Sequence, residues 1–453
     1  MNILESIAYH LGAPEPALRL VISLLAGYPV AAFYHHYVRS MSETLRHVFF
    51  VVVGLIIAYF NYGEDVMHSM MAVFGTYIFL QIFGASKESV CSIFTFTMLY
   101  LLAGYYLTGT ETYDIKWTMA QCVLTLRLIG LVFDIYDGAK PDELVPKNQR
   151  ETALQHVPSL LEIAAHAYFP GSFLVGPQFP MRRYLNFVKG KYDQETGDLS
   201  SCWAAGRKRC ALGFLYLAIY QLGSTYLPDS YLMSQTFLGH TFWKKCVIIG
   251  IWGKILLCKY ICCWLISEGV CISFGLTFNG KTPEGIIKWD GCQNVSLNVY
   301  ENATKFGDFI ASFNINTNLW VGTYIFRRLK FLGSRAISYA VTLTFLAVWH
   351  GLHSGYYACF FMEFVIMQFE REVTSLLRRH EKVKTVLLSP TVYPFVWVIL
   401  KLYTSVFMGY SLVPFALLSF GRWFDVYTSL YFCGHIGFLS LILLCRLLQL
   451  IHI

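Results

Sequence analysis

Long apolar runs dominate this chain and predict helices that cross a membrane. Each run is roughly 20 residues long and does not alternate between apolar and polar positions, which favours helices over the strands of a barrel. We find no internal repeat, and we therefore predict an all-α fold, a single polytopic membrane-embedded domain over residues 1–453. We expect about eleven spans, and twelve candidate stretches lie at 17–38, 47–62, 66–84, 90–107, 117–136, 211–222, 247–274, 319–326, 337–349, 352–369, 393–420 and 427–451.

Two polar stretches interrupt this pattern. Residues at about 138–209 are rich in charge, proline and glycine, and we interpret them as one long cytoplasmic connection with amphipathic helices. Residues 279–308 contain the motif WDGCQNV, and their Trp, Asp and Asn residues indicate re-entrant or interfacial chain rather than a span. The second stretch also contains two sequons, at Asn294 and Asn302, which matter only if that loop faces a lumen.

The composition supports the membrane class. The 453 residues are 56% hydrophobic and only 14% charged, whereas an ordinary soluble protein has about 25% charged residues. The formal net charge is +7, and much of the excess lies in loops, as expected at a cytoplasmic face beside anionic lipid. Residues 1–12 lack a basic n-region, so we expect the first run to act as an uncleaved anchor.

Two histidines interrupt the apolar stretch LAVWHGLHSGYYACFFMEF. His350 and His353 are three residues apart, and on a continuous helix they would share one face. They could be hydrogen-bonded core residues, metal ligands or general bases. A metal is disfavoured because Glu363 is turned about 80° around such a helix and no other local ligand is present. A base is chemically reasonable, since imidazole has a pKa of about 6.5 in water.

Polar residues also gather just upstream, in SFNINTNLWVGTYIFRRLKFLG. One asparagine in a membrane helix often makes a helix–helix hydrogen bond, but Asn314, Asn316 and Asn318 together indicate a polar cavity or an irregular backbone. A histidine and an asparagine can serve acyl transfer from acyl-CoA to a hydroxyl group, as the base for the alcohol and the donor for the thioester oxygen. The thioester is already activated, so this chemistry requires neither a metal nor a further cofactor.

At these motifs the sequence resembles the membrane-bound O-acyltransferases. The similarity runs over most of the chain and is strongest in FLVGPQFPMRRYLNF (173–187), KYICCWLISEG (259–269), WDGCQNV (289–295), FNINTN (313–318) and WHGLHSGYY (349–357). The resemblance implies a helical bundle around a central tunnel, with His350 and Asn314 as the catalytic pair near mid-membrane. It leaves open whether Asn314 orients the hydroxyl or polarises the thioester. His353 is implied only as a residue that tunes or orients the site.

The same resemblance suggests further substrate-binding residues. Lys259, Tyr260, Trp264 and Glu268 match a family motif near the tunnel, although Glu268 could simply pair with a lysine. The basic cluster Arg327, Arg328 and Lys330 is expected either to hold CoA phosphates or to act as a positive-inside stop.

Within the family, GPQF, SFNINTN, GLVFDIYDG and WHGLHSGY...MEF are similar to the lysophospholipid acyltransferase branch. That branch implies transfer of polyunsaturated acyl groups, such as arachidonoyl, to the sn-2 hydroxyl of lysophosphatidylcholine, with lysophosphatidylethanolamine and lysophosphatidylserine as further acceptors. It implies acyl-CoA, a lysophospholipid and membrane lipids as partners, no nucleic acid, and residence in the endoplasmic reticulum. A monomer and a homodimer both remain open. The alternatives are another acyltransferase of the family, acting on diacylglycerol, sterol or protein, and a transporter.

Overall fold

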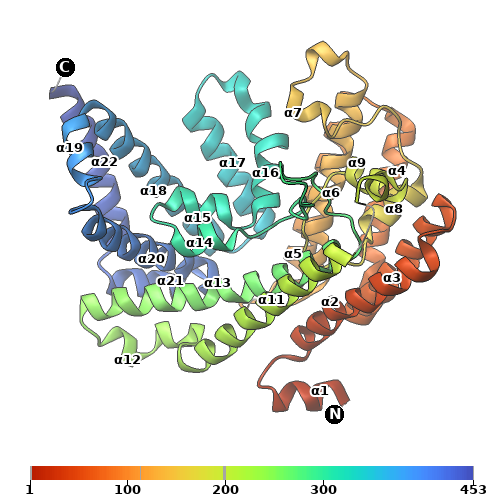
Figure 1. Ribbon diagram of the computed structural model, residues 1–453. Coiled ribbons are helices and arrows are strands. Elements are labelled where there is room, and N and C mark those ends of the chain that lie inside the picture. Colours follow the sequence, from red (N-terminus) through yellow and green to blue (C-terminus); the bar gives the residue numbers. More distant parts are fainter. Residues whose placement is uncertain (1–2, 113, 197–199, 452–453) are drawn as a thin grey trace.

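The computed structural model describes residues 3–112, 114–196 and 200–451, which form an α-helical bundle (Figure 1). Within them β-structure is limited to two isolated bridges, Lys281–Ile287 and Val295–Phe313. The all-α prediction is therefore confirmed. The α-helices are α1 (Ile3–His10), α2 (Glu15–Phe33), α3 (Glu43–Tyr62), α4 (Val66–Phe83), α5 (Lys87–Thr108), α6 (Trp117–Gly138), α7 (Lys147–Arg150), α8 (Leu160–Ala167), α9 (Met181–Val188), α10 (Lys191–Thr196), α11 (Ser200–Tyr226), α12 (Gln235–Leu238), α13 (Phe242–Ser273), α14 (Leu297–Asn302), α15 (Phe306–Ser312), α16 (Ile315–Tyr324), α17 (Arg335–His350), α18 (Ser354–Arg379), α19 (Glu381–Leu387), α20 (Tyr393–Leu417), α21 (Phe420–Ser429) and α22 (Cys433–Ile451).

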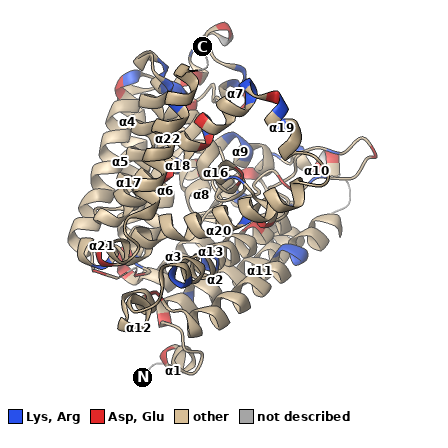
Figure 2. Ribbon diagram, turned by 90° about the vertical axis from the view of Figure 1, so that its left-hand side faces the viewer, with Lys and Arg blue, Asp and Glu red and all other residues tan. Residues whose placement is uncertain are grey.

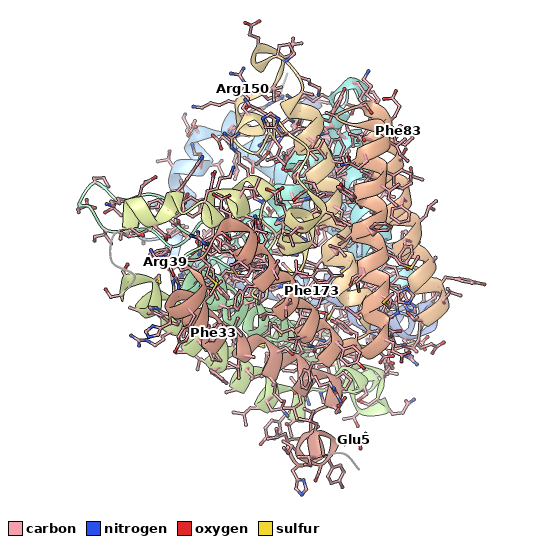
Figure 3. All side chains as sticks on the ribbon, turned by 90° about the vertical axis from the view of Figure 1, so that its right-hand side faces the viewer. Glu5, Phe33, Arg39, Phe83, Arg150 and Phe173 are labelled. Atoms are coloured by element: carbon pink, nitrogen blue, oxygen red, sulfur yellow. The ribbon has the colours of Figure 1, made fainter. Side chains whose placement is uncertain are left out.

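Charge distribution along the bundle agrees with a multi-pass membrane protein. Figure 2 shows α4 and α5 almost without charged residues along their length, with charges near α7 and α19 at one end and near α21 at the other. Figure 3 places Arg150 and Phe83 at one end of the molecule and Glu5 at the opposite end. Among the described residues, eight stretches are long and apolar enough to cross a membrane: Glu15–Val38, Glu43–Phe83 (α3 and α4 together), Lys87–Thr108, Trp117–Gly138, Ser200–Met233, Phe242–Ser273, Tyr393–Leu417 and Cys433–Ile451.

Three predicted spans, at 319–326, 337–349 and 352–369, are not among these eight stretches, and the first of them is too short to cross alone. The prediction at 319–326 falls in α16, which has 10 residues and is therefore about 15 Å long, half the thickness of a typical hydrocarbon core. Of the three asparagines before it, Asn314 lies in the break between α15 and α16, whereas Asn316 and Asn318 lie in the first turns of α16. Residues 279–308 also contain no span, and they fold into loops and the short helix α14.

The long helices α11, α13 and α20 pack closely through glycines. Gly206 of α11 faces Ser273, and Gly253 of α13 lies directly against Gly409 of α20. A Cβ atom added at Gly253 would lie only 2.5 Å from the Cα of Gly409. Small residues that let membrane helices approach each other are typical of such interfaces. This packing holds α13, which carries the residues Lys259 to Glu268, against both α11 and α20.

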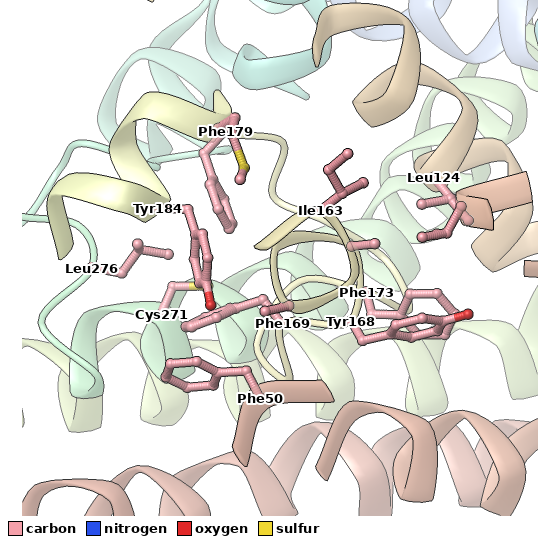
Figure 4. Close-up of a cluster of buried hydrophobic side chains, with 14 of the residues drawn as sticks. Phe50, Leu124, Ile163, Tyr168, Phe169, Phe173, Phe179, Tyr184, Cys271 and Leu276 are labelled. Carbon is pink, nitrogen blue, oxygen red and sulfur yellow. The ribbon is translucent and has the colours of Figure 1, made fainter. Parts of the chain in front are cut away.

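The stretch expected as a cytoplasmic connection, at about 138–209, is largely folded into the bundle. Residues 197–199 of it lie outside the described residues, and α11 already begins at Ser200. Figure 4 shows Phe169 of this stretch packed on Phe50 of α3, with Tyr168 and Phe173 beside each other in the same cluster. These aromatic side chains are almost fully buried. The stretch does include the expected amphipathic helix, since α9 buries Met181, Tyr184, Phe187 and Val188 and exposes Arg182.

A buried arginine holds the irregular part of this stretch in place. The Arg127 guanidinium on α6 donates to the carbonyl oxygens of His166 at 2.8 Å and Ala167 at 3.1 Å, and to the Ser172 hydroxyl at 3.0 Å. Its charge also lies over the ring of Phe179, 5.0 Å from the centroid. A non-helical backbone at membrane depth requires such partners for its carbonyl groups, so Arg127 explains how the chain after α8 can be both irregular and buried.

Candidate active site

A cavity of about 1160 Å³ lies inside the bundle. Its wall contains His350, the last residue of α17, and Asn314, which immediately precedes α16. The cavity extends from the junction of α1 and α2 and the face of α11 to α15 and α18. The volume lies slightly above the usual range of about 300–1,000 Å³ for small-molecule sites. The structure thus brings the two predicted catalytic residues to one large internal space.

His350 presents its imidazole to the cavity from an aromatic surround. Its ring centroid lies 5.4 Å from that of Phe360, 5.2 Å from that of Phe415 and 5.7 Å from that of Tyr356. The neighbouring Trp349 is fixed by a hydrogen bond from its indole nitrogen to the Cys122 carbonyl at 2.9 Å. In the described part of the chain neither ring nitrogen of His350 has a hydrogen-bond partner. The imidazole is therefore oriented by packing and available to a ligand.

His353 does not share this position. Helix α17 ends at His350 because Gly351 adopts φ 146°, a conformation that favours glycine, and a Cβ at this position would also lie 2.9 Å from the Tyr356 ring. His353 precedes α18 and does not line the cavity. The expectation that the two histidines share a helix face is wrong, because it assumed one continuous helix through Gly351.

Asn314 owes its position to an unusual backbone conformation. It adopts the left-handed region, with φ 51° and ψ 46°, and lies between α15 and α16. Asparagine tolerates this conformation better than most residues. Its side-chain oxygen accepts a hydrogen bond of 3.3 Å from Nδ2 of Asn294, in the loop before α14. The left-handed turn thus directs the Asn314 amide both to Asn294 and to the cavity.

The surrounding hydrogen bonds determine which way the Asn314 amide points. The backbone N–H of Asn316 can only donate, and it donates to Asn294 at 3.1 Å. The accepting atom of Asn294 is therefore its Oδ1, and the NH₂ group of Asn294 faces Asn314. The atom of Asn314 that accepts this bond must in turn be Oδ1. Its own NH₂ group is consequently left for the cavity, as a donor for a ligand oxygen.

The other two asparagines stabilise the loop rather than the cavity surface. Nδ2 of Asn316 donates to the carbonyl oxygens of Cys292 and Gln293, both at 3.0 Å. Nδ2 of Asn318 donates to Ile310 at 2.6 Å and Phe313 at 3.0 Å, although Asn318 also touches the cavity. The three asparagines therefore act together: two satisfy backbone carbonyls of an irregular segment, and Asn314 presents a donor.

Glu268 of α13 lies behind this network, not in the cavity wall. It is 2% exposed, and its Oε1 accepts from the backbone N–H groups of Asn294 at 2.6 Å and Val295 at 3.0 Å. Its Oε2 pairs with Nε of Arg209 at 3.0 Å. The cation partner is thus an arginine on α11, where the sequence suggested a lysine. Glu268 supports Asn294, which in turn orients Asn314.

The three other residues of that motif do line the cavity. Lys259, Tyr260 and Trp264 follow one face of α13, and the Lys259 ammonium lies 5.2 Å from the Tyr260 ring centroid. The Trp264 ring lies 4.8 Å from that of Phe313, next to Asn314. Their position is compatible with a binding role, which stays a prediction.

The basic cluster lies outside the cavity. Arg328 is engaged by Asp137 at the end of α6, with Nη2 to Oδ2 at 2.5 Å, and its guanidinium lies 4.0 Å from the Phe133 ring centroid. Arg327 and Lys330 are exposed on the short 3-10 helix Phe326–Leu332 between α16 and α17. The cluster therefore divides into one arginine that ties two segments together and two cations open to a ligand.

The sequence did not identify two cavity residues as site candidates. Asn294 stands out in the sequence only as a sequon, but it is 2% exposed and hydrogen-bonded inside the bundle, which is no position for a glycan. Glu363 stands out only as a possible metal ligand, yet it lines the cavity from α18. The position of Asn294 directly after the polar motif WDGCQ was the available signal for the first, and the isolated charge in an apolar run was the signal for the second.

Comparison with known proteins gives a consistent result. Residues 102–413 match the membrane-bound O-acyltransferase family. The chain is 45% identical over 439 residues to lysophospholipid acyltransferase 5 of Homo sapiens, a match that covers 97% of this chain and 90% of the relative. It is 44% identical over 441 residues to lysophospholipid acyltransferase 5 of Drosophila melanogaster, covering 96% and 87%. A more distant relative is membrane-bound glycerophospholipid O-acyltransferase 2 of Mus musculus, 26% identical over 466 residues, covering 98% and 87%.

Proposed function

This chain belongs to the membrane-bound O-acyltransferase family, and on that premise we propose that it transfers the acyl group of an acyl-CoA to the free hydroxyl of a lysophospholipid. The similar proteins named lysophospholipid acyltransferase support the acceptor class. The observation that carries the proposal is the convergence of His350 and Asn314 on one cavity large enough for lipid chains.

Each side chain has a defined task in this mechanism. The neutral His350 imidazole takes the proton of the sn-2 hydroxyl as its oxygen attacks the thioester carbonyl carbon. The carbonyl oxygen gains negative charge, and the NH₂ group of Asn314 donates a hydrogen bond to it. The C–S bond then breaks, an ester forms, and the CoA sulfur leaves with the proton held by His350. No external oxidant, metal or covalent acyl-enzyme is needed to balance these steps.

The orientation of Asn314 favours the thioester as its target. An amide oxygen facing the cavity would accept from the hydroxyl, whereas an NH₂ group donates to an oxygen. Because Oδ1 is occupied by Asn294, the donor side remains for the substrate. This hydrogen bond supports the thioester oxygen, rather than the hydroxyl, as the group that Asn314 contacts.

The preferred substrates follow from the branch that the motifs resemble. We place arachidonoyl-CoA first among acyl donors and lysophosphatidylcholine first among acceptors, with lysophosphatidylethanolamine and lysophosphatidylserine behind it, in the endoplasmic reticulum membrane. Aromatic residues of the cavity wall, such as Phe360 and Phe415, support selection by chain shape. One misfitted methylene is worth about 1–3 kcal/mol, so the preference should be graded.

Arg327 and Lys330 are the proposed contacts for CoA phosphates. Both are exposed, and they lie beside the start of α17, since the Ser338 hydroxyl donates to the Leu329 carbonyl at 3.1 Å. His350 is at the other end of α17, about 22 Å away along the helix. An extended pantetheine arm spans on the order of 16 Å from sulfur to the first phosphorus, from bond lengths of about 1.5 Å. The arm is about 6 Å shorter than this separation, so the long side chains of Arg327 and Lys330 would have to cover the remainder.

The direct test is transfer from radiolabelled acyl-CoA by the purified protein in lipid nanodiscs. The acceptor panel contains the three lysophospholipids, diacylglycerol and a sterol. We expect labelled diacyl phospholipid, formed fastest from arachidonoyl-CoA and lysophosphatidylcholine. Label in triacylglycerol or sterol ester, with none in phospholipid, would contradict the acceptor class. A preference for palmitoyl-CoA would contradict only the proposed chain selectivity.

A further inference from the structure

Glu363 is a carboxyl group in the cavity wall that the mechanism above does not use. It is on α18, one helical turn beyond Cys359 and Phe360, which also line the cavity. The Tyr339 hydroxyl of α17 donates to its Oε1 at 3.4 Å. No other hydrogen bond to this carboxyl is found among the residues that the structure describes. One acceptor oxygen is therefore left for a ligand, in an otherwise apolar part of the wall.

Glu363 lies close to His350, on the side of it that faces the exposed basic residues. The Phe360 ring stacks on His350, with centroids 5.4 Å apart, and Glu363 is three residues further, about 4.5 Å along α18. Its partner Tyr339 lies near the start of α17, close to Arg335 and the segment that carries Arg327 and Lys330. Glu363 thus lies between His350 and the exposed basic residues.

Few parts of the two substrates offer hydrogen-bond donors at this place. His350 engages the sn-2 hydroxyl, which leaves the ammonium of an ethanolamine or serine headgroup and the amides of the pantetheine arm. The acyl chain and the lysolipid chain are hydrocarbons. The lysolipid phosphate is an anion, which a carboxylate in a membrane interior would repel. The pantetheine arm of CoA has two amide N–H groups, the nearer of them three bonds from the thioester sulfur. With the thioester at His350 and the phosphates at the basic residues, this arm passes along α17 and α18.

We propose that Glu363 binds the pantetheine arm of acyl-CoA by accepting a hydrogen bond from one of its amide N–H groups, with Tyr339 holding the carboxyl in place. This inference rests on the proposed function, since it presumes acyl-CoA as the donor. Glu363 is accordingly a substrate-binding residue that sets the register of the thioester, not a group that takes part in bond making or breaking.

The test compares Glu363→Ala, Glu363→Gln and the exposed control Glu284→Ala with acyl-CoA and with an analogue whose pantetheine amides are replaced by esters. A hydrogen bond to a charged group is worth a factor on the order of 10 to 100. We expect Glu363→Ala to raise KM for acyl-CoA by at least about 10-fold and to leave KM for the lysophospholipid unchanged. The wild type and the control should discriminate against the ester analogue, and Glu363→Ala should not.

If Glu363→Ala discriminates against the ester analogue as strongly as the wild type does, the inference is wrong. So would a change confined to KM for lysophosphatidylcholine, which would assign the carboxyl to the choline group. If Glu363→Ala does not fold, Glu363→Gln keeps the size and an acceptor oxygen and should show a smaller rise in KM for acyl-CoA. A wild-type protein inactive with every acyl-CoA would instead refute the proposed function, so the two failures are distinguishable.

Discussion

Asn294 donates a hydrogen bond of 3.3 Å to the side-chain oxygen of Asn314 and so turns the NH₂ group of Asn314 toward the cavity. The orientation is fixed from behind, because Asn294 uses its own oxygen for the backbone N–H of Asn316. A residue in a loop before α14 thereby determines which atom of the proposed catalytic amide meets the substrate.

Replacement of Asn294 by aspartate should therefore impair the chemical step. An aspartate can still accept from Asn316, but it cannot donate to Asn314. The Asn314 amide would then turn its NH₂ group to the aspartate and its oxygen to the cavity. We expect Asn294→Asp to lower kcat by about 10²–10³-fold, as the loss of one oxyanion donor does, with little change in KM for either substrate.

The matched control is Asn302→Asp, at the exposed second sequon, which should behave like wild type. Melting temperatures in nanodiscs show whether both variants are folded. Wild-type kcat in a folded Asn294→Asp protein would mean that the orientation of Asn314 does not matter to catalysis.

Loss of the Glu268 carboxylate should lower the stability of the protein, and it should lower activity because the loop that contains Asn294 depends on it. Its carboxylate pairs with Arg209 and accepts two backbone N–H groups of the loop that contains Asn294. Removal of one partner from a buried ion pair costs about 3–5 kcal/mol. We expect Glu268→Ala to lower the melting temperature strongly, and Glu268→Gln, which keeps an acceptor, to lower it less. Equal melting temperatures for Glu268→Ala and wild type would show that this network does not support the fold.

Gly355 should not tolerate even a methyl group. A Cβ atom at this position would lie 2.0 Å from the carbonyl oxygen of Pro414, where α18 meets the end of α20. Overpacking of this kind typically costs about 1–3 kcal/mol. We expect a lower melting temperature for Gly355→Ala, whereas Gly437→Ala, on α22 with open space around it, should match or exceed wild type. The same melting temperature for both variants would contradict the close contact of α18 and α20.

The basic cluster should separate into two kinds of residue. Each exposed cation contributes little, about 0.2–1 kcal/mol, so the double variant Arg327→Ala/Lys330→Ala should raise KM for acyl-CoA a few-fold, and added salt should reduce the difference. Arg328→Ala should instead lower the melting temperature, because it leaves the buried carboxylate of Asp137 without its arginine. An unchanged KM for acyl-CoA in the double variant, at low salt, would remove these two residues from the CoA site.

The apolar pattern of the sequence was sufficient for the helical class and for most of the long helices, because run length and composition decide membrane crossing. It also located His350 and Asn314, since polar residues in apolar runs are rare and conspicuous. The family resemblance was nevertheless needed to single out Asn314 from Asn316 and Asn318. All three are asparagines in the same short segment, and only the three-dimensional hydrogen bonds distinguish them.

Other features depend on tertiary structure and were not predictable. The break at Gly351 separates His353 from the cavity, and it rests on a backbone conformation that favours glycine, at a position where the Tyr356 ring leaves little room for a Cβ atom. The stretch 138–209 as a whole is rich in charge, proline and glycine, but the buried aromatic residues after α8 and the buried Arg127 decide its place in the core. Glu363 reaches the cavity because α17 and α18 fold back on each other, which brings it to Tyr339.

The most direct measurement is the initial rate of acyl transfer to lysophosphatidylcholine by folded His350→Ala protein, beside His353→Ala as the matched control. His350 lines the cavity and His353 does not. General-base catalysis contributes typically about 10²–10⁴-fold. The rate of acyl transfer by His350→Ala should therefore fall by at least about 10²-fold, at an unchanged melting temperature. His353→Ala should keep most of its activity. A His350→Ala protein that retained more than about a third of the wild-type rate, far above the residual activity expected on loss of a base, would contradict the role of His350 as the general base.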